Sequence, residues 1–214
     1  MKKITFWLLA LFICWQVNAQ VNAYSFSTGT TGTLDPMTGS TQLIGSGSDD
    51  GVSAVTNIGF TFNYSGTDYT QFSVNANGLV RLGATVVTNS WTNSAANANT
   101  NTPAIMAHWD DHATGTDGKV HYVVVGTAPN RKLIIEWFVT VPRNTAGAAN
   151  AKFQCVLEET TNVISTVYGS GMLLNTAYGA TTGLATSTTV FNNVDVVTNT
   201  NTTATFITNN TAAI

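Results

Sequence analysis

Aspartates are the first side chains in the sequence whose type and placement could do chemistry. Asp49, Asp50, Asp110, Asp111 and Asp117 all lie in stretches that predict loops. Calcium takes several hard oxygen ligands from carboxylates and turn carbonyls, which such loops supply. We therefore predict a calcium site that uses Asp110, Asp111 and Asp117. The alternative is that these carboxylates cap their own turns or are simply solvated.

A second candidate centre is formed by histidines. His108, Asp110 and His112 stand two residues apart, so in an extended segment all three would lie on one face. Two imidazoles and a carboxylate could bind zinc, with His121 close by in the sequence. Pro103, just before them, favours a bent segment instead. The simpler interpretation, partly exposed loop histidines, is preferred here.

Glycoside hydrolysis is the enzymatic alternative, because it needs two carboxylates that face each other. Glu136 lies in a predicted strand, and Glu158 or Glu159 could be its partner. A pairing of Glu136 with Arg131 or Lys152 on a neighbouring strand explains it equally well. No G-x-S-x-G motif is present, and no motif connects a serine to a histidine or an aspartate. We therefore expect no enzyme activity, with a glycan-cleaving jelly roll as the alternative.

Carbohydrate binding without catalysis needs exposed aromatic rings beside polar loop residues. Trp91 is the only large apolar residue of the Asn-rich loop from Thr88 to Thr102, and Tyr69 and Tyr178 are further candidates. An aromatic residue of this kind also commonly pins its loop to the body of a protein. The predicted ligand-binding residues are Trp91, Asp110, Asp111 and Tyr178.

Strands must position these candidate residues. The stretch from Asn57 to Gly83 has the strand and turn pattern that would do so. Large apolar residues alternate with small or polar ones from Ile58 to Tyr64, which places one row on one face of a strand. Ser65 to Asp68 has the composition of a turn, and Asn77-Gly78 is a strong hairpin signal. A face of this kind needs a second layer to cover it.

The remainder of the chain repeats this pattern and shows no helical periodicity. Further strands are predicted at residues 84–87, 119–125, 131–141, 151–159, 163–168, 180–184, 188–191 and 203–207. Many short strands separated by turns are typical of sandwiches. The predicted fold is all-β: a two-sheet antiparallel β-sandwich of jelly-roll type.

The first residues predict export. Lys2 and Lys3 precede an apolar run that is too short for a membrane span and ends at Val17-Asn18-Ala19. Residues 1–19 are therefore interpreted as a signal peptide and residues 20–214 as a single domain, secreted or held at the cell surface. Without the two lysines the charge is 6 − 11 = −5. This excess of acid disfavours nucleic-acid binding, and no membrane insertion is expected after cleavage.

The order of these motifs resembles a known family. The series includes Ile58-x-Phe60-x-Phe62-x-Tyr64, Asn77-Gly78, Trp109-Asp110-Asp111, Glu136-Trp137 and Phe153-x-Cys155-x-Leu157. It is similar to a β-sandwich module of secreted and surface proteins of the Bacteroidetes and, distantly, to the nidogen-type extracellular domain. The resemblance implies an adhesive or matrix role. We expect an adhesion module that binds polysaccharide or another surface protein, the alternative being a structural module of a larger assembly.

Overall fold

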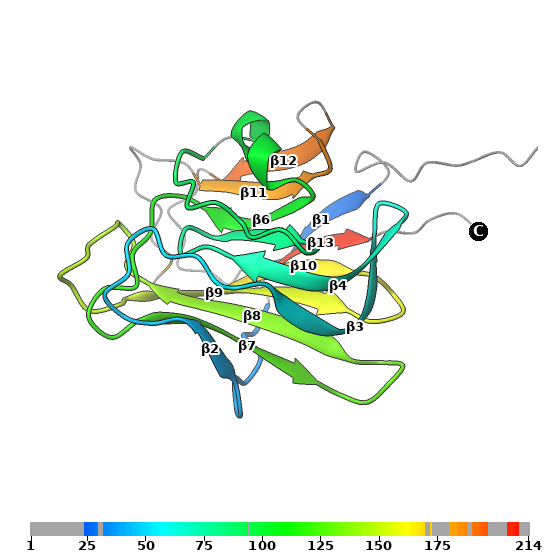
Figure 1. Cartoon of the computed structure of the whole chain (residues 1–214), viewed down its shortest axis with the longest axis horizontal. Coiled ribbons are helices and arrows are strands. Elements are labelled where there is room, and N and C mark those ends of the chain that lie inside the picture. Colours follow the sequence, from blue (N-terminus) through cyan, green and yellow to red (C-terminus); the bar gives the residue numbers. More distant parts are fainter. Residues whose placement is uncertain are drawn as a thin grey trace, which may run out of the picture.

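The structure is a computed structural model, and it describes residues 24–29, 32–93, 95–169, 172, 180–187, 190–196 and 205–209. Its strands form two antiparallel sheets (Figure 1). The seven-stranded sheet has the order β1 (Ser25–Gly29), β13 (Thr205–Asn209), β10 (Ile164–Tyr168), β9 (Ala151–Glu158), β8 (Lys132–Val139), β7 (Lys119–Val125) and β2 (Thr41–Ile44). The six-stranded sheet has the order β12 (Phe191–Val196), β11 (Ala180–Ala185), β6 (Ala104–Trp109), β5 (Leu79–Leu82), β4 (Thr67–Val74) and β3 (Thr56–Tyr64).

The two-sheet antiparallel β-sandwich predicted from the sequence is confirmed. Strands β3 to β6 follow one another across one sheet, and β7 to β10 do the same across the other. Most pairings are therefore between strands that are consecutive in the chain, although β5 and β6 are joined by a long segment. The predicted signal peptide and Tyr178 lie outside the described residues. So do residues 203–204 of the strand expected at 203–207 and residues 188–189 of the strand expected at 188–191.

The alternating run in β3 forms the inner face of the six-stranded sheet. Ile58, Phe60, Phe62 and Tyr64 are all buried, while the residues between them are exposed or only partly covered. The chain then reverses at Ser65-Gly66, where both residues have positive φ, 53° and 82°. Two positive φ values in a two-residue loop match the right-handed twist of the strands that it joins. The predicted turn is therefore confirmed at these residues.

Aromatic side chains fill the space between the sheets. Trp137 on β8 stacks on Phe153 on β9, with ring centroids 5.0 Å apart and planes within 6°. The indole Nε1 of Trp137 donates a 2.8 Å hydrogen bond to the carbonyl of Asn75, at the end of β4 in the opposite sheet. Because this bond crosses the core, it fixes the β4–β5 turn relative to the seven-stranded sheet.

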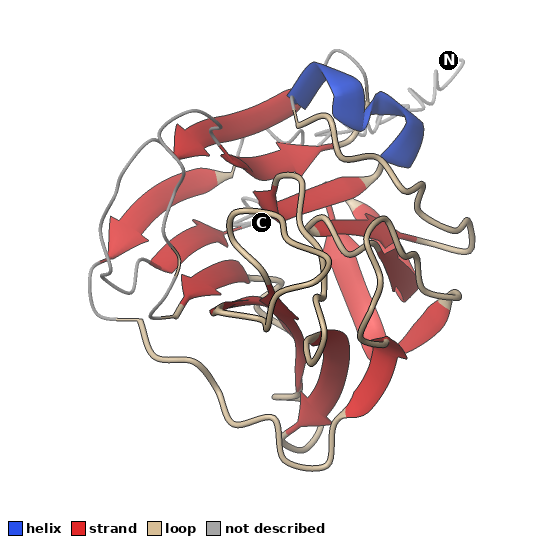
Figure 2. Ribbon diagram, turned by 90° about the vertical axis from the view of Figure 1, so that its left-hand side faces the viewer, coloured by secondary structure: helices blue, strands red, loops and turns tan. Residues whose placement is uncertain are grey.

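The outer face of the six-stranded sheet is covered by the segment from Gly83 to Pro103. This segment contains the 3-10 helix η2 (Ala95–Asn101), drawn in blue in Figure 2, which packs against β11 and β12. A small second core lies beneath it, made of Leu79, Val87, Ala98, Ala104, Met106, Trp109 and Ala185. The strand expected at residues 84–87 is wrong: these residues are a loop whose Val87 reaches into this small core.

The outer face of the seven-stranded sheet is covered by residues 32–40, called the covering segment below. Leu34 lies against Gly169 just after β10, since a Cβ on that glycine would come within 2.7 Å of the Leu34 side chain. Asp35 is held on β9 by Gln154, whose side chain accepts a hydrogen bond from the Asp35 amide and donates one to its carbonyl, both 2.8 Å. No helix in the described part of the chain is long and apolar enough to cross a membrane.

Candidate functional site

Three loops meet at one end of the six-stranded sheet around the side chain of Asn77. They are the loop before β3 (Gly45–Gly51), the β4–β5 turn that contains Asn77, and the segment after β6 (Asp110–Thr114). The Asn77 amide donates to Asp50 Oδ1 at 2.9 Å, and its Oδ1 accepts from the backbone N–H of His112 at 2.9 Å. Asn77 is fully buried. One amide side chain therefore sets the distance between two acidic loops.

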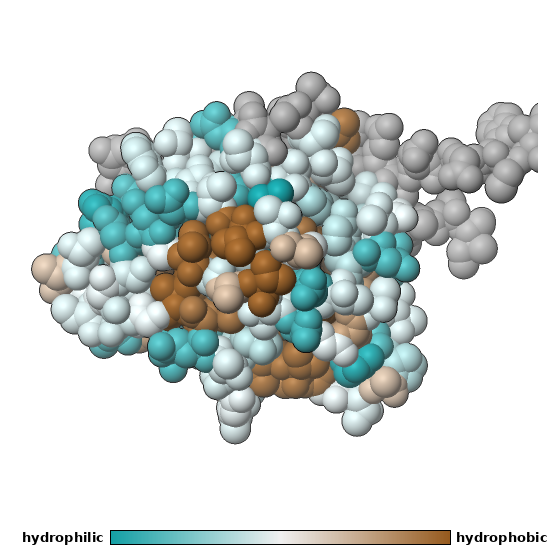
Figure 3. Space-filling view, in the orientation of Figure 1, coloured by the Kyte–Doolittle hydropathy of each residue, from teal (hydrophilic) through white to brown (hydrophobic). Residues whose placement is uncertain are grey.

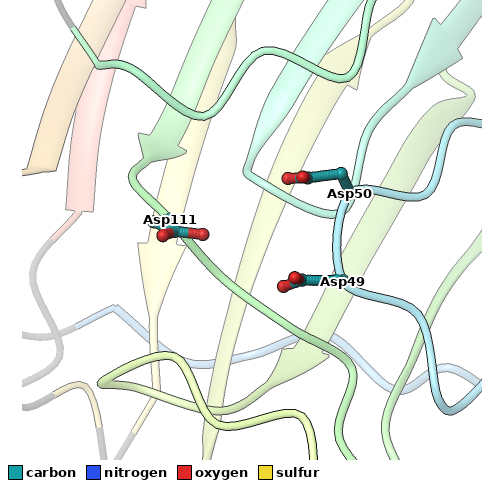
Figure 4. Close-up of side chains that lie close together, drawn as sticks. All are labelled: Asp49, Asp50 and Asp111. Carbon is teal, nitrogen blue, oxygen red and sulfur yellow. The ribbon is translucent and has the colours of Figure 1, made fainter.

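Three carboxylates gather where these loops meet. Oxygen atoms of Asp49, Asp50 and Asp111 lie within 4.8 Å of one another, and Figure 4 shows the three side chains facing a common space from the two loops. Each is partly exposed. Such a group could hold a metal ion, and its oxygen ligands suit a hard cation.

A guanidinium group already occupies part of this space. Arg143, after β8, donates from Nε to Asp49 Oδ1 at 2.6 Å and from Nη2 to Asp49 Oδ2. Its Nε also lies 3.3 Å from Asp111 Oδ1. These contacts raise the pKa of Arg143, the hydrogen bonds to Asp49 contributing most. In this arrangement the arginine supplies the positive charge that a metal ion would otherwise bring.

The electrostatics at Asp111 reflect the crowding of negative charge. Burial raises the pKa of its carboxyl above the usual value. Arg143 acts in the opposite direction, and the carboxylates of Asp49, Asp50 and Asp110 raise the pKa again. A ligand that brings hydroxyl hydrogens or positive charge to this group would therefore relieve repulsion.

The structure rearranges the predicted calcium ligands. Asp111 belongs to the carboxylate group, but Asp110 and Asp117 do not. Asp110 Oδ1 accepts from the N–H of Asp111 at 2.8 Å, and Asp117 Oδ1 accepts from the N–H of Ala149 at 2.7 Å. Asp110 thus bonds within its own turn, as the alternative interpretation expected, whereas Asp117 connects its turn to the distant loop before β9. Their places are taken by Asp49 and Asp50.

Trp91 is 53% exposed. It follows Ser90, whose carbonyl accepts hydrogen bonds from Asn75 at 3.1 Å and from Asn77 at 3.5 Å. Because Asn77 also binds Asp50, a single amide connects the Trp91 loop to the acidic loop. The loop is thus anchored by its backbone and by Val87, and the indole of Trp91 is left largely free.

The surface around these loops is partly apolar. Figure 3 shows apolar residues gathered over β4 and the loops beside it, bordered by hydrophilic ones. Val52 and Val86, each 43% exposed, are the other large apolar side chains exposed among the described residues. Tyr69, the other aromatic candidate, packs edge-on against Tyr64, and burial raises its pKa. Tyr178 lies outside the described residues.

The expectation that His108 and His112 are partly exposed loop residues is wrong. Both are 1% exposed, and their rings stack with centroids 5.2 Å apart beside Phe153. Burial lowers the pKa of each imidazole, so both are neutral. His121 is elsewhere, on the outer face of the other sheet, where its Nε2 lies 3.0 Å from Glu136 Oε1.

The glutamates weighed for glycoside hydrolysis each have a partner. Glu136 accepts from His121 and from Gln154, not from Arg131 or Lys152. Two ion pairs hold the others: Glu158 with Lys132 at 2.8 Å and Glu159 with Arg131 at 2.6 Å.

The residues that the sequence interpretation missed are Asn77 and Arg143. In the sequence, Asn77 appears only as part of a hairpin signal, and Arg143 lies in no motif. The SGSDDG sequence at residues 46–51 was the available signal for Asp49 and Asp50, since two adjacent carboxylates in a glycine loop must face either solvent or a cation.

The fold and this end of the molecule define an antiparallel β-sandwich that presents a polar, loop-borne surface. The family model described as "NIDO related" matches residues 23–214. The chain belongs to this NIDO-related family, and it is therefore a nidogen-related extracellular domain. Comparisons with curated proteins and with solved structures gave no match.

Proposed function

We propose that this chain is a non-catalytic, secreted or surface-held adhesion module that binds carbohydrate at the loops around Asn77. The observation that carries the proposal is the half-exposed ring of Trp91 on a loop tied, through Ser90 and Asn77, to the Asp49–Asp50–Asp111 group. Exposed aromatic rings next to hydrogen-bonding side chains are the elements that sugar recognition uses. Family membership supports the extracellular setting.

The chemistry of the site favours a particular class of sugar. The apolar face of a pyranose ring would stack on Trp91, and its hydroxyl groups would donate hydrogen bonds to the carboxylate oxygens. An ionised carboxylate accepts hydrogen bonds and cannot donate them. Three carboxylates with one arginine leave excess negative charge, and the whole chain is acidic. Neutral or amino sugars are therefore expected to bind, and uronic or sulfated sugars to be repelled.

Calcium is the proposed cofactor of the same loops. Asp49, Asp50 and Asp111 would each supply a carboxylate oxygen, and Arg143 would have to move away from Asp49 and Asp111. Because binding then replaces an existing ion pair, the affinity should be at the weak end, roughly in the 10⁻⁴–10⁻³ M range of extracellular modules.

The test is a glycan-binding experiment on two variants of the same loop. Trp91→Ala removes the indole ring on which the sugar would stack. Val86→Ala is the matched control, because Val86 is also a half-exposed apolar residue of that loop. We expect Trp91→Ala to weaken binding of a neutral oligosaccharide roughly tenfold or more, which is about 1.4 kcal/mol. The thermal stability of both variants should stay close to that of the parent chain.

Two results would contradict the proposal. One is equal affinity of the Trp91→Ala and Val86→Ala variants for every sugar bound. The other is a glycan array on which no neutral or amino sugar binds, which would favour the alternative role of a structural module whose partner is another surface protein.

A further inference from the structure

A hydrogen-bonded chain of side chains crosses the outer face of the seven-stranded sheet, away from the carbohydrate site. His121 on β7 stands directly opposite Glu136 on β8, and Glu136 stands opposite Gln154 on β9. Directly paired residues of antiparallel strands point to the same face. All three are buried, with exposed fractions of 5% or less. Such a buried row must satisfy its polar groups internally.

The covering segment supplies the end of this row. Ser40 Oγ lies 2.8 Å from His121 Nδ1, while His121 Nε2 lies 3.0 Å from Glu136 Oε1. The Glu136 Oε2 atom accepts a 2.8 Å hydrogen bond from Gln154 Nε2. A serine, an imidazole and a carboxylate are thus connected in order, with a fourth residue holding the carboxylate.

Proton positions in this chain follow from the chemistry of its groups. Burial raises the pKa of Glu136, but the hydrogen bonds from His121 and Gln154, together with the nearby His121 and Lys152 charges, lower it below its usual value. This carboxylate is therefore ionised at neutral pH and can only accept. The imidazole must therefore carry a proton on Nε2. In the neutral form of the ring, Nδ1 is the acceptor and the Ser40 hydroxyl is the donor.

Ser40 is held in this position by its backbone. The segment Met37–Ser40 forms a turn closed by a 3.2 Å hydrogen bond from Ser40 N to Met37 O, with Gly39 at φ 73°. Ser40 itself is only partly covered, in contrast to the buried His121 and Glu136. The serine that contacts the base is therefore the least buried member of the row.

We propose that Ser40 is a nucleophile activated by His121 and that it accepts acyl groups from activated esters. In this step the Ser40 oxygen bonds to the acyl carbon, the alkoxide or phenolate leaves, and the hydroxyl proton passes to His121 Nδ1 and then to the leaving group. The ionised Glu136 stabilises the imidazolium that forms in between. Gln154 and Glu136 are positioning residues, since they act only through the imidazole.

The experiment measures covalent labelling of the full chain by p-nitrophenyl acetate and by a fluorophosphonate probe, with peptide mapping of the labelled residue. We expect a single acyl or phosphonyl group on Ser40. Ser40→Ala should remove the label, and His121→Gln should slow labelling by roughly 100-fold or more, the range of general-base catalysis. Thr38→Ala is the matched control, because Thr38 is an exposed hydroxyl of the same turn and should not matter.

The Ser40→Cys variant provides a second test that does not depend on the folding of His121→Gln. Ser40→Cys should react with iodoacetamide at least tenfold faster than Thr38→Cys, because an adjacent imidazole favours the thiolate. The native Cys155 is buried and has a pKa raised to about 12, so it should not contribute to the signal. Equal rates for the two thiols, or esters that label Thr38 as readily as Ser40, would overturn the proposal.

Discussion

Replacement of Gly78 by alanine is the sharpest test of how the loops around Asn77 are built. Gly78 has φ 90°, and a Cβ there would lie 2.2 Å from the carbonyl oxygen of His108 and 2.7 Å from its carbon. Backbone atoms cannot swing aside as a flexible side chain can. The end of β6 would have to move away from the turn, together with Asp110, whose N–H now donates to Asn77 O at 3.1 Å.

The expected loss of unfolding free energy has two parts, a conformational part and a steric part. A second variant, Gly47→Ala, measures the conformational part alone. Gly47 has φ 75° but nothing within 4 Å of an added Cβ, so Gly47→Ala should lose only the conformational part, roughly 1–2 kcal/mol. Gly78→Ala should lose this and a further part for the forced movement, about 1–3 kcal/mol by comparison with overpacked cores. We therefore expect Gly78→Ala to be less stable by about 2–5 kcal/mol in total, which lowers the Tm by roughly 4–20 °C in a chain of this size.

Urea unfolding followed by circular dichroism measures both variants on the same scale. The unfolding free energy of Gly78→Ala should fall well below that of Gly47→Ala. If the two differ by less than about 0.5 kcal/mol, the usual size of a surface effect, the close approach of the turn to β6 is wrong. The glycan affinity of the folded Gly78→Ala fraction should also fall, because Asn77 and Asp111 are moved apart, whereas Gly47→Ala should bind as the parent does.

Three further results are expected. Trp137→Ala should lose about 3–5 kcal/mol in urea unfolding, since it removes the stacked ring and leaves the Asn75 carbonyl without its donor; a loss under about 1 kcal/mol would contradict the packing. Burial lowers the pKa of His108 and His112 below 6.5, so in acid the unfolded chain binds protons that the folded chain does not. The Tm should therefore fall as the pH drops through and below 6.5. A Tm that stays constant over this pH range would refute the neutral histidine pair. Arg143→Gln should make the Tm rise by several degrees on addition of calcium, more than in the parent chain, because the competing cation is gone; identical Tm values in calcium and in chelator for both chains would exclude the metal site.

The sequence was most informative where the structure depends on neighbouring residues. The run from Ile58 to Tyr64 has a period of two, and the Ser65-Gly66 turn follows it at once, so the hairpin could be predicted from local chemistry. Residues 84–87 show the limit of this reasoning. Their composition suits a strand, but Val87 is used to bury the outer face of the six-stranded sheet, and that demand comes from residues elsewhere in the chain.

The candidate site could be predicted only in its residue types. Asp110, Asp111 and Asp117 lie in predicted loops, and loop carboxylates of this kind predict an ion site. Asp117 instead caps the loop at Ala149, and Asp111 meets Asp49 because Asn77 holds the two acidic loops together. The burial of His108 and His112 could not be predicted for the same reason, since it depends on Phe153 in the other sheet.

The hydrogen-bonded series of Ser40, His121 and Glu136 shows why a search for sequence motifs cannot find every candidate nucleophile. Ser40 and His121 are 81 residues apart, and no short pattern around either residue suggests a connection. What joins them is the pairing of β2 with β7, where Gln42 stands opposite His121 and leaves Ser40, two residues earlier, at the start of the strand. A shift of this pairing by one residue would turn the side chains of β2 to the opposite face and change where Ser40 enters the strand. The reactivity of Ser40 is therefore a direct measure of strand register, and a labelled Ser40 would confirm the placement of β2 as well as the chemistry of the site.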